Sequence, residues 1–159
     1  MPEHNPEHAI EHSNAVNEFI EHMGRVSEGD GLPRIAGRLF AFLIANEGDY
    51  SLKSLSDELQ VSRGSISTNA KLLESLGVIE RVTQAGDRQD YFKLRDDPYS
   101  QLFRGIVIRM DNALTGIHKA TANMDKKSVS VKRIQQLESF YQAFLTHTQE
   151  LLDSWERND

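Results

Sequence analysis

The sequence predicts a mainly α-helical fold that contains one small β-hairpin and has long helices at both ends. Two short helical patterns, Ser51 to Leu59 and Ser62 to Gly77, are separated by a tight turn and followed by two alternating, strand-like stretches. Apolar residues recur at steps of three and four on both sides of this region. We expect four segments: a flexible tail at 1–8, a helix at 9–29, a compact domain at 30–97 and a helical region at 98–159.

The composition is that of an ordinary globular protein without disulfides. The 159 residues are 38% hydrophobic and 26% charged, and they include no cysteine. The longest apolar run, residues 39–45, is far shorter than the roughly 20 residues that a membrane-spanning helix needs. The first residues, MPEHNPEH, have no basic and apolar pattern of a secretory signal. We therefore expect a cytoplasmic protein with no membrane partner.

The N-terminal region is expected to form one helix after a short tail. Pro2 and Pro6 should block an early helix start, and residues 27–33, SEGDGLP, contain the residues that break helices. Between them lies one apolar stripe, formed by Val16, Phe19, Met23 and Val26. This stripe predicts a helix with a single face that packs on another surface.

The central region predicts three helices and a hairpin in succession. Ile35, Leu39 and Leu43 share one helical face, and this helix should stop near Gly48. Ser51 is expected to cap the next helix, whose leucines at 52, 55 and 59 point inward. Ser62 should cap the following helix, which ends at Gly77. Residues 78–84 and 91–95 then predict two strands around the turn AGDRQD. This order is that of a winged helix-turn-helix domain.

The C-terminal region predicts two long helices joined by residues 125–128, DKKS. Their apolar residues keep steps of three and four over about three heptads, which is typical of a helix pair or bundle. The compact domain is too small to cover these helices, so we expect them to pack on a second subunit; an intramolecular hairpin is the alternative. The residues expected to form the dimer interface are Phe19, Met23, Phe103, Met110, Ile134, Tyr141, Phe144, Leu151 and Trp155.

The helix after Ser62 has an apolar face and an opposite face of small and polar residues. With 100° per residue, Ala70 and Leu73 lie within about 40° of Ile66 and should be core. Small side chains on the other face would let a helix enter a DNA major groove, where hydroxyl groups, lysine and arginine can bind phosphates or bases. The predicted DNA-binding residues are Ser62, Arg63, Gly64, Ser65, Ser67, Thr68 and Lys71, with Arg88 at the hairpin tip for the minor groove. The alternative for this face is an ordinary solvated helix start, and for Arg88 pairing with Asp87 or Asp90.

The net charge of −6 is unevenly distributed. Residues 31–95 carry nine basic and eight acidic side chains, a net of +1, whereas the remainder has a net of −7. A DNA-binding surface needs to be basic only locally. Arg34 and Arg38 lie four residues apart on one helix, where they could contact phosphate or pair with local acids.

Residues 52–94 resemble the winged helix-turn-helix of the MarR superfamily of bacterial regulators. The stretches GLPRIAGRLFAFL and VSRGSIS and the Gly-Asp-Arg turn are similar to its GbsR-like branch. The resemblance implies a homodimer held by the terminal helices, with two recognition helices in successive major grooves. It also implies control of nearby genes, here expected to be repression, with modulation by a small effector. Many relatives have an Asp-x-Arg wing, whereas Asp87 and Arg88 are adjacent here.

Other patterns point to no enzyme and no cofactor. The serines of SRGSIS lack the G-x-S-x-G arrangement of a catalytic nucleophile, and no phosphate-binding glycine loop is present. His4, His8 and His12 are spaced as zinc ligands could be, but Pro6 interrupts the pattern, so a solvated tail is favoured over a metal sensor. The rival function is a winged-helix adaptor that binds proteins and not DNA.

Overall fold

The computed structural model describes residues 6–122, 124 and 128–157, with side chains from Ser13 onward, and it forms two compact units that meet in sequence at Pro98 and Tyr99. The first unit contains α1 (Pro6–Gly29), α2 (Arg34–Ala45), β1 (Tyr50–Ser51), α3 (Leu52–Leu59), α4 (Arg63–Ser75), β2 (Ile79–Thr83) and β3 (Asp90–Leu94). The second is built from α5 (Pro98–Thr121) and α6 (Val129–Glu156). The mainly helical fold with a small hairpin is confirmed.

The helix-turn-helix is formed by α3 and α4, and both helices have the predicted serine caps. The Ser51 hydroxyl accepts from the Ser54 amide at 3.1 Å, and the Ser62 hydroxyl accepts from the Ser65 amide at 3.2 Å. Each cap satisfies one of the amides that a helix N-terminus leaves free. Gln60 follows α3 with a left-handed backbone (φ 54°), and Gly77 follows α4 with a φ of 78°. The predicted turn and the predicted end of α4 are therefore confirmed.

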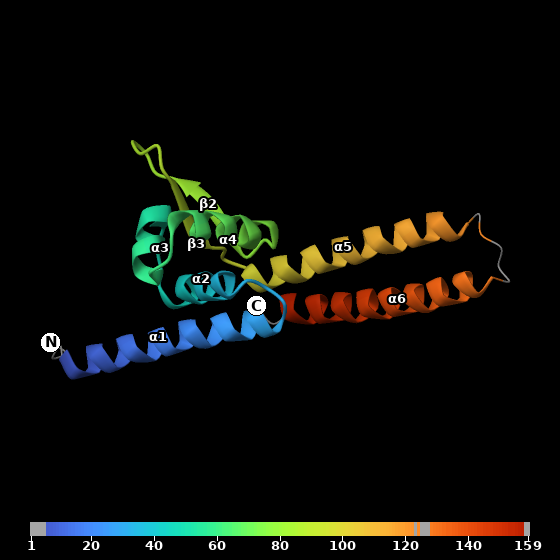
Figure 1. Cartoon of the computed structure of the whole chain (residues 1–159), viewed down its shortest axis with the longest axis horizontal. Helices are drawn as coiled ribbons and strands as arrows, with labels where there is room; N and C mark the ends of the chain where they lie inside the picture. Colours follow the sequence, from blue (N-terminus) through green and yellow to red (C-terminus); the bar gives the residue numbers. More distant parts are fainter. Residues whose placement is uncertain (1–5, 123, 125–127, 158–159) are drawn as a thin grey trace. The chain divides into compact units, whose positions relative to one another are not determined.

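The wing is the hairpin of β2 and β3, which projects beyond the helices in Figure 1. The sheet has three antiparallel strands in the order β1-β3-β2, with Arg81 opposite Phe92 and Val82 opposite Tyr91. The third strand, β1, was not predicted, because two residues are too few to show an alternating pattern.

The core of the first unit lies where α2, α3, α4 and the sheet meet. Its largest fully buried side chains are Leu39, Leu55, Ile66 and Ile79, one from each of these four elements. The predicted inward positions of α4, Ile66, Ala70 and Leu73, are all buried. The opposite face of α4 is therefore the one directed away from the core.

The predicted start of α1 is wrong. The helix begins at Pro6 rather than at residue 9, because proline is well suited to the first helical position, where its missing N–H has no partner to lose. Its buried face is not the predicted apolar stripe: Ile20 is 5% exposed and Gly24 is buried, whereas Phe19 and Val26 of the stripe stay exposed. The stripe is thus not the face that packs on α2.

Helices α1 and α2 approach each other closely at two glycines. A Cβ atom on Gly37 would lie 2.5 Å from the Met23 carbonyl oxygen and 2.2 Å from the Ser27 hydroxyl. A Cβ atom on Gly24 would lie 2.7 Å from Cγ of Arg38. Hydrogen at these positions therefore sets the distance between the two helices.

We expect Gly37→Ala to destabilise the protein by about 1–3 kcal/mol, because the added methyl group would push the backbone of α1 away from α2. Urea unfolding measures the effect. The control is Gly116→Ala in α5, where nothing lies within 4 Å of the new Cβ. That change should stabilise the helix by up to about 1 kcal/mol. Equal stability changes in the two variants would contradict the close packing of α1 on α2.

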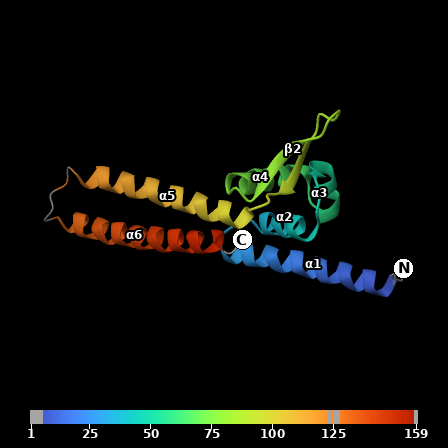
Figure 2. The same ribbon diagram turned by 180° about the vertical axis from the view of Figure 1, so that it is seen from behind.

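The second unit is an antiparallel pair of helices, seen side by side in Figures 1 and 2. Ser128 caps α6, and side-chain pairs join the two helices near both ends: Arg104 with Glu156, and His118 with Glu138 at 2.7 Å. Within the single chain, the two helices thus pair as the hairpin given above as the alternative, and packing on a second subunit stays a prediction. None of the described helices is long and apolar enough to cross a membrane.

Candidate nucleic-acid interface

The outer face of α4 presents the predicted polar and basic side chains together. Arg63, Gly64, Thr68 and Lys71 are exposed, as is the capping residue Ser62, whereas Ser65 and Ser67 are half-buried. The Thr68 hydroxyl donates to the Gly64 carbonyl at 3.0 Å, so its oxygen is held close to the helix. Small side chains therefore dominate this face, and only Arg63 and Lys71 extend far from the helix.

Gly64 is open to solvent on this face. A Cβ atom there would meet only the Ser62 hydroxyl, 4.0 Å away, so the fold itself does not require glycine. Glycine in a helix costs about 0.5–1 kcal/mol relative to alanine. Packing within the fold does not explain why this loss of helix stability is kept at position 64. Close approach of another molecule to the backbone at this position explains it.

We expect Gly64→Ala to raise the free energy of unfolding by about 0.5–1 kcal/mol and to weaken DNA binding. The methyl group would stabilise α4 but occupy the space into which DNA would fit. Thermal unfolding and a DNA titration by fluorescence anisotropy measure the two effects. Gly116→Ala is the matched control, because it should stabilise α5 without changing affinity. Unchanged affinity in Gly64→Ala would contradict close approach at this residue.

Three basic side chains of the winged domain form no ion pair in the described part of the chain. Within residues 31–95, six of the nine basic side chains pair with carboxylates: Arg34, Arg38, Lys53, Arg81, Lys93 and Arg95. Across the described part of the chain, the other three make no ion pair, and they are Arg63, Lys71 and Arg88. These are the same three basic residues that the sequence analysis assigned to DNA.

The wing turn is organised by Asp87, which leaves Arg88 exposed. The Asp87 carboxylate accepts from the Gln89 amide at 3.0 Å and from the Tyr91 hydroxyl at 2.7 Å. The Tyr91 hydrogen bond lowers the pKa of Asp87 and raises that of Tyr91. Asp90 is occupied as well, since it pairs with Arg81 at 3.0 Å. Neither of the two acids considered as partners of Arg88 therefore forms an ion pair with its guanidinium group.

Arg34 and Arg38 are structural, which decides between the two roles considered for them. Both guanidinium groups contact Glu21 of α1, at 2.7 Å and 2.6 Å. The hydrogen bond from Arg34, together with the charge of Arg38, lowers the pKa of Glu21. Arg38 also donates to the Leu59 carbonyl at 2.9 Å. These two cations are thus engaged within the fold.

Sequence reasoning missed two contributors to this region. Asn69 is buried on α4, and its amide donates to the Ser65 carbonyl at 2.8 Å, so it supports the helix from inside. Asp87 was considered as a partner for Arg88 and as part of the wing motif, but it also holds the turn itself. An aspartate in a turn is a recognisable signal for this arrangement, because its carboxylate can accept a hydrogen bond from the backbone amide two residues later. The zinc-sensor alternative concerns His4, His8 and His12, whose side chains lie outside the described residues.

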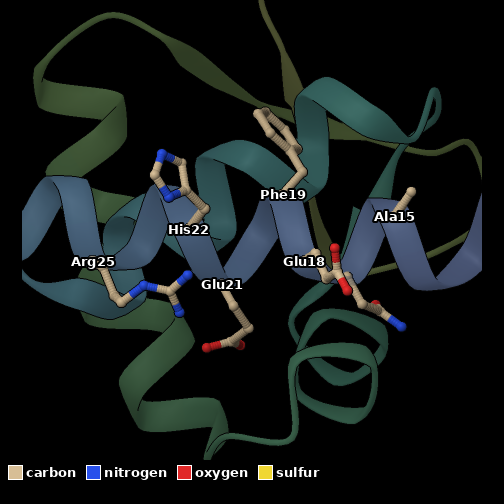
Figure 3. Close-up of a pocket in the computed structure, with 7 residues that line it drawn as sticks. Ala15, Glu18, Phe19, Glu21, His22 and Arg25 are labelled. Carbon is tan, nitrogen blue, oxygen red and sulfur yellow. The ribbon is translucent and has the colours of Figure 1, made fainter.

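The terminal helices carry uncovered apolar faces. On α6, four apolar residues lie within about 40° of Phe144 on a helical wheel, and like Phe144 (43%) they are 40–61% exposed: Leu137, Phe140, Leu151 and Trp155. Thr148, at the edge of the same stripe, is buried. On α1, Phe19 is 38% exposed. Figure 3 shows Phe19, His22 and Ala15 on the same side of α1, beside an open hollow lined by residues of that helix alone. Contiguous apolar faces of this kind usually mark interaction surfaces.

Of the nine predicted interface residues, none is fully buried in the single chain. Phe19, Phe144, Leu151 and Trp155 are exposed, and the other five, Met23, Phe103, Met110, Ile134 and Tyr141, are half-buried. The buried positions of α6 are Val131, Thr148 and Leu152, none of which is among the nine predicted interface residues. The predicted series is thus available for a further contact.

The helix-turn-helix with its exposed basic face and wing defines the chain as a winged helix-turn-helix protein. Residues 30–90 match the model of the MarR family. Over 86 residues the chain is 42% identical to the HTH-type transcriptional regulator MmpR5 of Mycobacterium tuberculosis (strain ATCC 25618 / H37Rv), a match that covers 54% of this chain and 52% of that protein. The chain thus spans about half the length of this curated relative.

A solved structure extends the similarity over most of the chain. A crystal structure described as a transcriptional regulator superposes with a TM-score of 0.78 at 28% identity, covering 90% of this chain and 99% of that chain. The similarity is thus to transcriptional regulators and not to enzymes, in agreement with the expectation from the sequence.

Proposed function

We propose that this protein is a sequence-specific DNA-binding transcriptional regulator that acts as a homodimer on a pseudo-palindromic operator. The observation that carries the proposal is a set of three basic side chains without an ion pair in the described part of the chain: Arg63 and Lys71 on α4 and Arg88 on the wing. Every other basic side chain of residues 31–95 is paired. In this arrangement α4 enters a major groove and the wing reaches the adjacent minor groove.

The uncovered faces of α1 and α6 support a homodimer. Side chains as large as Phe140 and Phe144 would lose water contact if the same stripe of a second copy packed on them. A two-fold axis is the commonest symmetry of such pairs, and it would present two copies of α4 to DNA. Two identical helices then require two inverted half-sites, roughly 34 Å apart.

Three further parts of the proposal rest on the resemblance of residues 30–95. Repression is proposed because a dimer bound over a promoter excludes other proteins from that DNA. A small effector is proposed to change the spacing of the two recognition helices, so that both half-sites no longer fit at once. The GbsR-like branch is proposed from the stretches GLPRIAGRLFAFL and VSRGSIS.

Salt dependence tests DNA binding through Lys71. If Lys71 binds a phosphate, Lys71→Ala should weaken binding by a similar factor on all duplexes. It should also flatten the plot of log affinity against log salt by about one for each subunit bound. Titrations between about 50 and 200 mM salt measure the slope.

The matched control is Lys53→Ala, because Lys53 is exposed on α3 but pairs with Asp57 at 2.7 Å. It should leave the slope unchanged. Wild-type protein without salt-dependent binding to any duplex would contradict the proposed function and favour the protein-binding adaptor.

A further inference from the structure

Arg38 connects three elements of the first unit through one side chain. It lies on α2, and its Nε atom is 2.6 Å from Oε1 of Glu21 on α1, as an ion pair rather than an aligned hydrogen bond. One of its terminal nitrogens donates to the Leu59 carbonyl of α3 at 2.9 Å. The side chain is 19% exposed, so these contacts are only partly screened by water.

The Leu59 carbonyl is the last one of α3 before the turn to α4. The final carbonyls of a helix have no partner within the helix, and a cation there is favoured by the helix dipole. The other bonds of this turn are local: the amides of Gln60 and Val61 donate to the Ser56 carbonyl, and the Ser56 hydroxyl donates to the Val61 carbonyl. Arg38 supplies the bond that ties the turn to a distant part of the chain.

On the other side, Glu21 belongs to α1, which lies outside the helix-turn-helix. The two helices are held close by the glycine contacts, with Gly24 directly over the Arg38 side chain. Arg34 binds the second oxygen of Glu21 but does not take part in the α3–α4 turn. Arg38 is thus the side chain through which a movement of α1 would reach the turn.

We propose that Arg38 is a positioning residue for DNA binding: anchored by Glu21, it fixes the α3–α4 turn and thereby the recognition helix relative to α1. The inference rests on the proposed function, since α4 is taken as the DNA-reading helix. It adds that α1 contributes to DNA affinity without touching DNA.

Amide hydrogen exchange tests the anchoring without any DNA. Arg38→Met should speed exchange at Gln60 and Val61 by at least about tenfold relative to the strand residue Phe92, because a charged hydrogen bond is lost. Glu21→Gln should give a smaller increase in the exchange rate at the same amides. It replaces Arg38→Met as the test if Arg38→Met does not fold. Arg34→Met is the matched control and should leave them unchanged. Unchanged exchange in both Arg38→Met and Glu21→Gln, or an equal increase in Arg34→Met, would overturn the proposal.

DNA titration tests the consequence. Arg38→Met should lower affinity at least about tenfold while the salt slope stays that of the wild type, because no phosphate contact is removed. A flatter slope would show direct phosphate contact by Arg38 and overturn the positioning role, as would unchanged affinity. If the wild type binds no DNA, the proposed function fails, whereas the exchange experiment still decides whether Arg38 anchors the turn.

Discussion

Replacing Arg63 with alanine is expected to cost the protein most of its sequence-specific DNA binding. Arg63 is exposed in the first turn of α4, and no ion pair holds it within the described chain. An arginine bound to the O6 and N7 atoms of guanine contributes about 1–3 kcal/mol of discrimination. A homodimer carries two such contacts, so the operator affinity should fall by at least about 30-fold. Competition between operator and random duplex in anisotropy titrations measures the loss.

The conservative variant Arg63→Lys separates base reading from charge. Lysine keeps the positive charge but lacks the planar, two-pronged donor geometry of arginine. We therefore expect Arg63→Lys to retain binding to random DNA while losing most of the preference for the operator. Equal losses on operator and random duplexes in Arg63→Ala would show a phosphate contact instead of base reading.

Placing a charge on the α6 stripe is expected to dissociate the homodimer. Phe144 lies in the middle of the exposed apolar series and is 43% exposed in the single chain. If a second copy covers it, Phe144→Asp would bury an unpaired carboxylate, at a cost of several kcal/mol. We expect the dissociation constant of the dimer to rise by at least about 100-fold. Sedimentation equilibrium across a concentration series measures it.

The matched control is Ser139→Asp, because Ser139 is exposed on the opposite side of α6. It adds the same charge to the same helix and should leave the dimer intact. The DNA affinity of Phe144→Asp should fall together with its dimerisation, because a monomer can bind only one half-site at a time. A Phe144→Asp protein that sediments like the wild type would place the dimer interface elsewhere.

The helix-turn-helix could be predicted because each of its signals is local. Ser51 and Ser62 are strong caps, Gly77 suits a left-handed end, and the leucines of α3 lie on one face. The exposed face of α4 followed from the same periodicity, since Ile66, Ala70 and Leu73 define the buried side. The sequence was sufficient to predict an element wherever residues within or next to that element set its boundaries and its buried face.

The remaining features depend on contacts between distant residues, which a local pattern does not contain. The buried face of α1 is set by the glycine contacts with α2, so Ile20 is buried instead of Phe19. The pairing of Arg34 and Arg38 with Glu21 spans 13 or more residues. The strand β1 exists only because Tyr50 and Ser51 meet Phe92 and Tyr91. The roles of these residues emerge only once the chain is folded.

Selection of bound duplexes from a random DNA pool is the most direct test of DNA reading by a dimer. The purified wild-type protein would be used at about 100 mM salt, with Phe144→Asp in parallel. We predict enrichment of an inverted repeat whose half-sites lie about one helical turn apart, and its loss in the Phe144→Asp pool. A wild-type pool without any enriched motif, or with a single unrepeated motif, would contradict the proposal that two copies of α4 read DNA together.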